Sequence, residues 1–467
     1  MEKIKKARGG NDPLVTILVI IVCAVILTWI IPAGEFAESV DEAGNTVIDI
    51  LTFHTVDSSP VSVLSIPVLI MQAFEKCISI IVLIAAGSGA FEVVRRTGTI
   101  DSIIGLTLEK TKGNGKKALW IVSLIFTLLS CAVIPHVFIP FTHMCISLAL
   151  ALGYDDFTGT ALVLLATVVG GATGSPIAPG TVAAQSMLGL PAYSGIQYRF
   201  VIMVLYYFVT MFYLIRYAEK VRKNPAASVV AGMSDDRKRQ IESLKAADYS
   251  KVTTNHILVM AVMVATFATV IYGGFSLGWG NYQIAAAFFV MGLICGLIGK
   301  MNPAAISKGF VDGVKALTST YIIIGMATAV TSILSGGNII NTIIYYLCKG
   351  LSHWPVIVAP IGIMFAVAIV NLFVPSMNGK MPLVFPILGP VCKVLGINQQ
   401  LLVITYAFGD SFTNFILPYN SALVGFIEAG HVTYGQWIKF FKGLLALWFL
   451  LGAVILVALQ LIGIGPF

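Results

Sequence analysis

Polar and ionisable residues gather in four short segments of a chain that is otherwise apolar. These segments are CAVIPHVFIPFTH (131–143), GGATGSPIAPGT (170–181), FVPSMNGKMP (373–382) and GDSFTNFILPYNS (409–421). Because Pro lacks a backbone donor and Gly tolerates left-handed geometry, such segments are typical of helices that stop, expose backbone groups and restart. In a membrane, exposed backbone is tolerated only where protein or a water-filled cavity satisfies it. The four segments therefore predict one polar cavity.

Two ionisable residues in these segments could carry the chemistry of a binding site. Asp410 follows a ten-residue run without charge, and Lys380 is the only Lys or Arg between Lys349 and Lys393. Charge inside a membrane is costly and usually functional. Asp410 is a candidate cation ligand, proton carrier or partner for a substrate ammonium group. For Lys380 three interpretations remain open: ligand of a substrate carboxylate, ion-pair partner of Asp410, or a side chain that reaches the membrane surface.

The ends of broken helices add binding groups of their own. Free N–H groups at a helix N-terminus suit a carboxylate, and freed carbonyl oxygens suit a cation. His136 and His143 could titrate near neutral pH, although a single membrane histidine more often bonds one helix to another. The oxygen-rich surroundings of Asp410 favour Na⁺ over a proton. The predicted substrate-binding residues are His136, Thr173, Ser175, Thr181, Ser376, Asn378, Lys380, Asn414, Asn420 and Ser421, and the predicted cation-coupling residues are Asp410, Ser411, Thr413, Gly171 and Gly174, with a Na⁺ site near Asp410 and Asn414.

The composition indicates what kind of elements position these residues. Of the 467 residues, 57% are hydrophobic and only 11% are charged, whereas soluble domains carry about 25% charged residues. Apolar windows near the length needed to cross a bilayer predict about ten crossings plus two interrupted regions. The window at 14–33 is long for a signal peptide and lacks a cleavage site. The fold class is therefore an all-α polytopic membrane protein.

Charge gives the orientation of the chain in the membrane. Of the 29 Lys and Arg residues, 22 fall in the segments 1–8, 95–117, 216–251 and 300–315. By the positive-inside rule these segments and the N-terminus are cytoplasmic, in a bacterial-type cytoplasmic (inner) membrane. The segment 35–57 carries six acidic residues and no Lys or Arg, so it is expected outside. The net charge of +7 thus reflects topology, and we expect no nucleic-acid partner.

Similar short sequences recur at an almost constant offset. GGATGSPIAP (170–179) lies over GDSFTNFILP (409–418) at 239 residues, and GIQYRF (195–200) lies over GQWIKF (435–440) at 240. The first half begins after the acidic outer segment, and the second begins among cytoplasmic lysines, so the repeats are inverted. The predicted parts are an N-terminal helix and outer loop (1–61), repeat 1 (62–218, interrupted at 131–181), a cytoplasmic linker with a short helix at 234–246 (219–254), connecting helices (255–300) and repeat 2 (301–467, interrupted at 373–421).

Inverted repeats with broken helices are typical of secondary transporters that bind substrate near the membrane midplane. The sequence has no Walker A motif, so ATP is not the direct energy source. It has neither HExxH nor GxSxG, and we expect no enzyme. Seven cysteines without CxxC spacing argue against a zinc or redox site, so the only expected bound ion is Na⁺ or H⁺. A channel is the remote alternative.

Five segments carry a resemblance to a known family: IPAGEF (31–36), RYAEKVRKNPAASVV (216–230), PSMNGKMPLVFPILGP (375–390), GDSFTNFILPYNS and YGQWIKF (434–440). In these segments the sequence resembles the C4-dicarboxylate anaerobic carrier family, of the DcuC and YfcC type, in the ion-transporter superfamily. The resemblance implies a homodimer in the lipid bilayer with a scaffold part and a mobile part, two facing re-entrant hairpins and an elevator movement. It also implies small carboxylate or amino acid substrates, carried by symport or antiport, with basic amino acids exchanged by one branch.

The chain departs from that branch at the first polar segment. The branch has two adjacent acids before Ile-Pro-Phe, where this chain has HVF (136–138), and the family's Asn-Pro-Phe is here Ala178, Pro179 and Gly180. Without these acids, an arginine or ornithine antiporter becomes the alternative. The expected function is a cation-coupled secondary transporter of a small organic acid (dicarboxylate) or amino acid, with Lys380 and helix N-termini binding the carboxylate.

Overall fold

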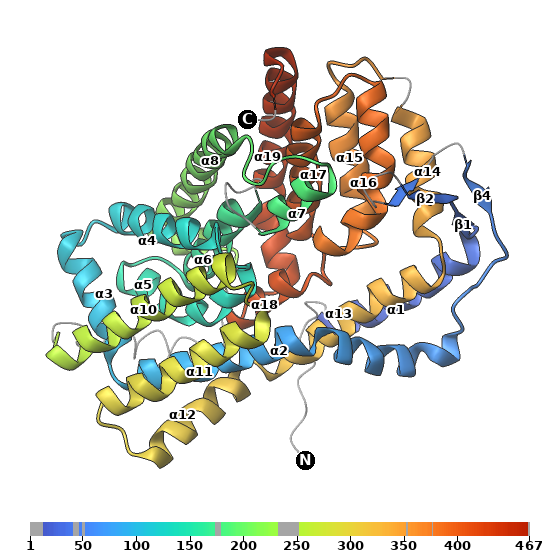
Figure 1. Cartoon of the computed structure of the whole chain (residues 1–467). Coiled ribbons are helices and arrows are strands. Elements are labelled where there is room, and N and C mark those ends of the chain that lie inside the picture. The colour runs from blue at the N-terminus through green and yellow to red at the C-terminus, as the bar shows by residue number, and fades with distance from the viewer. Residues whose placement is uncertain are drawn as a thin grey trace.

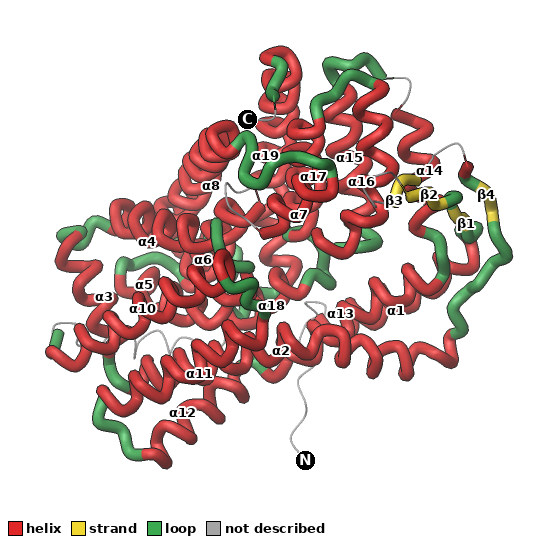
Figure 2. Tube along the Cα trace, viewed as in Figure 1, coloured by secondary structure: helices red, strands yellow, loops and turns green. Residues whose placement is uncertain are grey.

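The computed structural model describes residues 13–40, 46–48, 52–172, 179–231, 252–351, 354–375 and 377–465. The helix predicted at 234–246 lies outside these ranges, as do Thr173, Gly174, Ser175 and Ser376. The side chain of Asn378 also lies outside the description. Helices make up most of the described chain (Figure 2).

The first half of the chain runs from an N-terminal helix through a long helix to a series of shorter ones. Short 3₁₀ turns are labelled η. In order, the elements are α1 (Pro13–Ile30), β1 (Gly34–Glu35), β2 (Glu38–Val40), β3 (Thr46–Ile48), β4 (His54–Thr55), η2 (Val63–Ser65), α2 (Ile66–Arg96), α3 (Thr99–Lys110), α4 (Gly115–Ser130), η3 (Pro135–Phe141), α5 (Thr142–Ala151), α6 (Asp156–Ala172), α7 (Pro179–Met187), α8 (Ile196–Lys223) and η4 (Pro225–Ala227).

The second half continues with two connecting helices and then a further series. Its elements are α10 (Thr254–Ser276), α11 (Asn281–Ile298), α12 (Pro303–Ala316), α13 (Thr318–Gly336), α14 (Ile340–Leu351), α15 (Ala359–Asn371), α16 (Met377–Val394), α17 (Gln399–Asn414), α18 (Ser421–Ala429) and α19 (Tyr434–Ile462). Polar caps fix several of these starts. Asn398 and Thr433 accept backbone N–H groups at the first turns of α17 and α19, which satisfies donors that a helix cannot satisfy itself.

The described chain contains six helices that are long and apolar enough to cross a membrane: the helix of residues Val63–Arg96, α8, α10, α11, α13 and α19. Four shorter apolar helices add to these, at Ile17–Ile30, Pro135–Ala151, Asp156–Gly171 and Ala359–Asn371. A multi-pass membrane protein is therefore confirmed. Fewer described helices reach the length of a full span than the apolar windows predicted, because several windows fall on these shorter helices.

The acidic segment after α1 corrects the expectation of an all-α chain. Two antiparallel ribbons form there, β1 with β4 and β2 with β3. Gly34 pairs with Thr55 and Glu35 with His54 in the first ribbon. This segment is polar and follows a membrane helix. It lacks the apolar periodicity that predicts a helix, so its sequence does not require one.

Two groups of helices surround the centre of the molecule (Figure 1). The long helix α2 packs against α11, α12 and α13, and α1 packs against α13. In the other group α4 packs against α6, and α15 packs against α17. Glycine allows the last contact to be close, because a Cβ at Gly409 would lie 2.5 Å from the carbonyl oxygen of Met364 in α15.

Candidate functional site at the helix breaks

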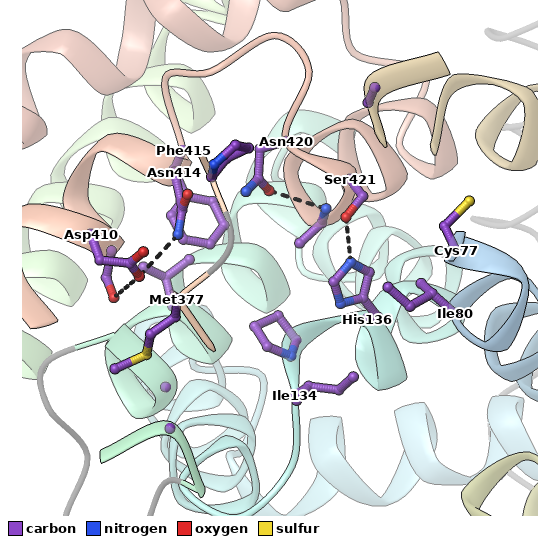
Figure 3. A pocket seen from close by; sticks show the side chains of 18 of the residues that line it. Cys77, Ile80, Ile134, His136, Met377, Asp410, Asn414, Phe415, Asn420 and Ser421 are labelled. Atoms are coloured by element: carbon purple, nitrogen blue, oxygen red, sulfur yellow. Dashed lines mark hydrogen bonds between the residues drawn. The ribbon is translucent and has the colours of Figure 1, made fainter. Parts of the chain in front are cut away.

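All four polar segments border a single cavity of about 480 Å³ (Figure 3). The described residues of the four segments that line it are Cys131, Val133, Ile134, Pro135 and His136 from the first, Gly171 and Gly180 from the second, Pro375 and Met377 from the third, and Asp410, Ser411, Asn414, Phe415, Tyr419, Asn420 and Ser421 from the fourth. Helices α2 and α13 supply the remaining wall, with Lys76, Cys77, Ile80, Ala327, Thr328 and Thr331. The segments that share polar composition in the sequence thus meet in space.

The fourth segment is helical for longer than its sequence predicts. Helix α17 continues through Gly409 and Asp410 to Asn414, and the interruption covers 415–420 before α18 begins. Asp410 therefore lies on a formed helical turn, which corrects the interpretation of 409–414 as an unwound stretch. The glycine serves the close packing of α15 on α17 rather than a helix end. The side chain of Thr413 donates to the carbonyl of Gly409 at 2.8 Å within the same turn.

Aromatic side chains satisfy the carbonyl groups freed at this interruption. Trp437 Nε1 donates to the carbonyl of Phe415 at 2.7 Å, and Tyr434 donates to that of Ile416 at 2.5 Å. Both donors lie in the first turn of α19. An unpaired carbonyl in an apolar interior costs about 1–3 kcal/mol, so these bonds stabilise the break without any bound ion.

Lys380 and Asp410 form a buried ion pair. Lys380 Nζ donates to Asp410 Oδ1, and the exposed fraction is 0% for Lys380 and 1% for Asp410. The ring centroid of Tyr406 lies 5.6 Å from the same ammonium group. Lys380 does not itself line the cavity, whereas Asp410 does. Among the three interpretations of Lys380, its position here is that of the ion-pair partner of Asp410.

Asn371 links the members of this buried group and was not among the predicted site residues. Its Oδ1 accepts a hydrogen bond from Lys380, and its Nδ2 lies 2.8 Å from the carbonyl oxygen of Asp410. The same Nδ2 lies 2.8 Å from Thr413 Oγ1 and 2.9 Å from Asn414 Oδ1. The available signal was an amide directly after the apolar run of α15, just before the third polar segment.

His136 reaches across the cavity to the fourth segment. Its Nε2 lies 2.8 Å from Ser421 Oγ (Figure 3), and its Nδ1 has no hydrogen-bond partner among the described residues. His143 lies elsewhere, lining a separate cavity of about 120 Å³ with Glu92 and Arg95. The two histidines therefore do not share a site.

The remaining predicted residues divide between the cavity and its supporting structure. Gly171, Ser411, Asn414, Asn420 and Ser421 line the cavity. Asn420 also caps α18 by accepting from the backbone N–H groups of Ala422 and Leu423. Thr181 is buried in α7 away from the cavity lining, and Thr413 lies behind it in the network of Asn371.

Lys76 lines the cavity and was also not among the predicted site residues. It lies in α2, and its Nζ donates to Ser332 Oγ of α13 at 3.1 Å. Among the described residues that line the cavity, Lys76 is the only Lys or Arg and Asp410 the only acid. The signal was a lysine inside a long apolar helix, which is expensive unless it faces a polar space.

Comparison with known proteins gives matches to one family over almost the whole chain. The model of the family described as C4-dicarboxylate anaerobic carrier matches residues 11–461. YfcC of Escherichia coli (strain K12), provisionally named a basic amino acid antiporter, is 28% identical over 97% of this chain and 96% of its own. An uncharacterized protein of Haemophilus influenzae is 24% identical over 98% of each chain. These matches confirm the resemblance carried by the sequence motifs.

Two solved structures align over almost the whole chain at low identity. MtrF of Neisseria gonorrhoeae, from a class of antimetabolite efflux pumps, has a TM-score of 0.47 and 15% identity, covering 96% of this chain and 95% of its own. The YdaH transporter of Alcanivorax borkumensis has a TM-score of 0.43 and 15% identity, covering 98% and 99%.

Proposed function

Because the chain belongs to the C4-dicarboxylate anaerobic carrier family, we propose that it is a secondary active transporter of a small organic acid, with dicarboxylates as the first candidates. The substrate binds in the cavity between the four polar segments. Zwitterionic amino acids form the second candidate class, because their carboxylate can use the same groups.

The charge of the cavity is the observation that carries this proposal. Asp410 is paired with Lys380, so its negative charge is already balanced. Lys76 is the remaining ionised group among the described lining residues. An excess positive charge at the cavity favours an anion over a cation. The hydroxyl group of Thr331, which also lines the cavity, is an additional donor for a carboxylate.

The alternative is the basic amino acid exchange named for the YfcC relative. A guanidinium or second ammonium group in this cavity would need a free carboxylate, and burying it unpaired is costly. The only acid among the described lining residues is Asp410, which Lys380 already holds. The cavity therefore favours weak arginine binding, and this alternative ranks below organic acids and zwitterionic amino acids.

The order of elements supports two inverted repeats and alternating access. In each half a helix ends beside the cavity, a short helix follows, and a long helix completes the series: α6, α7 and α8, then α17, α18 and α19. Gly170 packs against α4 as its counterpart Gly409 packs against α15, since a Cβ at Gly170 would lie 2.1 Å from the carbonyl oxygen of Thr127. An elevator movement and a homodimer belong to the same proposal through family membership.

Ligand-dependent thermal unfolding of the purified protein tests the substrate class. A ligand that binds the folded state raises the melting temperature by mass action. Succinate, fumarate, glutamate, arginine and ornithine are compared in the same buffer. We expect the acids to raise the melting temperature and arginine to leave it unchanged. Stabilisation by sub-millimolar arginine, without an effect of any acid, would instead establish the antiporter alternative.

Counterflow in proteoliposomes then separates a carrier from a channel. Vesicles are loaded with the unlabelled acid that gave the largest stabilisation, and uptake of the labelled acid is followed. A carrier accumulates label transiently, because its binding site carries unlabelled substrate out and labelled substrate in. Its uptake also saturates as the substrate concentration rises. Uptake that neither saturates nor responds to internal substrate would favour a channel.

A further inference from the structure

We propose that the ammonium group of Lys380 takes the place of a coupling cation beside Asp410, so that the site needs no Na⁺. The proposal rests on the proposed function only in treating this position as a coupling site. Whether Na⁺ binds can be measured on the purified protein without any substrate.

The surroundings of Lys380 Nζ are those of a bound cation. The group donates to Asp410 Oδ1 and Asn371 Oδ1, and it lies 3.4 Å from the carbonyl oxygen of Val374. The ring of Tyr406 presents a further surface, with its centroid 5.6 Å away. Hard cations bind carboxylate, amide and carbonyl oxygens of these kinds, and aromatic rings attract cations as well. The side chain thus fills a cation site with a cation that is covalently attached.

The other oxygens predicted to hold Na⁺ already have partners. Asp410 Oδ2 accepts from Asn414 Nδ2 at 3.2 Å and from Ser411 Oγ at 3.3 Å. Asn414 Oδ1 lies 2.9 Å from Asn371 Nδ2. Thr413 Oγ1 donates to the carbonyl of Gly409. A Na⁺ ion entering here would have to break several of these bonds.

The carbonyl groups of Phe415 and Ile416 at the helix interruption also have partners, Trp437 and Tyr434 of α19. Displacing Lys380 would leave its ammonium group buried and unpaired, and separating one partner from a buried pair is strongly unfavourable. The observed network is therefore complete without an added ion.

An attached cation has a direct consequence for energy coupling. A Na⁺ gradient drives transport only if Na⁺ binds on one side and dissociates on the other. Lys380 cannot dissociate, so this site draws no free energy from such a gradient. Any coupling to Na⁺ then has to use a different site.

Sodium binding by the purified protein tests the proposal. Melting temperatures are measured in NaCl and in choline chloride at equal ionic strength, together with equilibrium binding of radioactive Na⁺. Lys380→Met removes the ammonium group and leaves the Asp410 carboxylate in place. Lys76→Met is the matched control, because it removes a cavity lysine that lies outside the network. Lys380→Met combined with Asp410→Asn removes both charges.

For wild type and for Lys76→Met, we expect the melting temperature in NaCl to equal that of the same protein in choline chloride. Neither protein should show saturable Na⁺ binding. Lys380→Met should melt lower in choline chloride and recover part of the loss in NaCl, since the vacated oxygens then accept Na⁺. The double variant should lose this response.

Saturable binding of Na⁺ to wild type that Asp410→Asn abolishes would overturn the proposal. A folded Lys380→Met protein without any Na⁺ response would also count against it, because the vacated oxygens would then not form a cation site. If Lys380→Met does not fold, the comparison of wild type with Asp410→Asn still decides. Absence of Na⁺ binding leaves the proposed transport function intact, and failure of every organic acid to bind would not alter the sodium result.

Discussion

His136 Nε2 and Ser421 Oγ lie 2.8 Å apart and join the first polar segment to the start of α18, although 285 residues separate them in the sequence. The contact closes one side of the cavity. It also leaves His136 Nδ1 without a partner among the described residues. A buried ring nitrogen without a partner is unfavourable, and a substrate donor or acceptor can satisfy it.

Replacing His136 should therefore weaken substrate binding more than replacing its partner. His136→Phe keeps a ring but removes both nitrogens, and we expect it to raise the free energy of binding by about 1–2 kcal/mol, the scale of one or two hydrogen bonds. Ser421→Ala should change binding by less than about 1 kcal/mol. Thermal-shift titration with the most strongly stabilising acid gives both values. Equal losses in the two variants would mean that the histidine acts only through Ser421.

Lys76 should supply most of the attraction for a carboxylate. Lys76→Gln removes the charge while retaining a polar side chain, so we expect binding of the acid to weaken by about 1.5–3 kcal/mol, as for a hydrogen bond to a charged group. The same titration measures the effect. Lys315, which the repeat offset aligns with Lys76 and which does not line the cavity, provides the control: Lys315→Gln should leave affinity unchanged. Wild-type affinity in Lys76→Gln would remove the basis for preferring anionic substrates.

Gly409 should be sensitive to a single added methyl group. A Cβ there would lie 2.5 Å from the carbonyl oxygen of Met364 and 2.7 Å from Val367 Cβ, so α15 and α17 would have to separate. We expect Gly409→Ala to reduce the free energy of unfolding by about 1–3 kcal/mol, as for overpacked cores. Gly274→Ala in α10, where nothing lies within 4 Å of the added atom, should have no such cost. Equal melting temperatures for the two variants would contradict this account of the helix contact.

Labelling from each side of the membrane tests the inverted orientation of the repeats. Single cysteines replace Ser58, directly after the acidic segment, and Ala226, in the basic segment after α8; both positions are exposed. In a background without the seven natural cysteines, an impermeant maleimide should label residue 58 in intact cells and residue 226 only after the cells are opened. Labelling of both from the same side would exclude inverted repeats.

The sequence was sufficient to predict the helical membrane fold, the family and the grouping of four polar segments around a cavity. It could not predict which polar groups pair with each other. Lys380 and Asp410 lie 30 residues apart, and their contact depends on how α16 packs against α17. Asn371 was missed because a single amide after an apolar run carries no local signal of the bonds it makes.

The end of α17 shows a second limit of sequence interpretation. Glycine accompanies both helix ends and close helix contacts, and Gly409 serves the contact with α15. These two roles can be distinguished only when the position of the neighbouring helix is known. The local sequence therefore predicted an interruption from Gly409, whereas α17 continues to Asn414. The ribbons after α1 were missed for a related reason, since strands of two or three residues are too short for alternation to be recognised.

The aromatic donors of α19 make assembly of the protein depend on the direction of synthesis. The carbonyl groups of Phe415 and Ile416 are completed by Trp437 and Tyr434, which the ribosome adds later. Until α19 enters the membrane, the interruption between α17 and α18 lacks these donors, and the nascent chain has to shelter it with water or the insertion machinery. The last long helix therefore completes, from behind, the hydrogen bonds of a cavity wall that the preceding segments form.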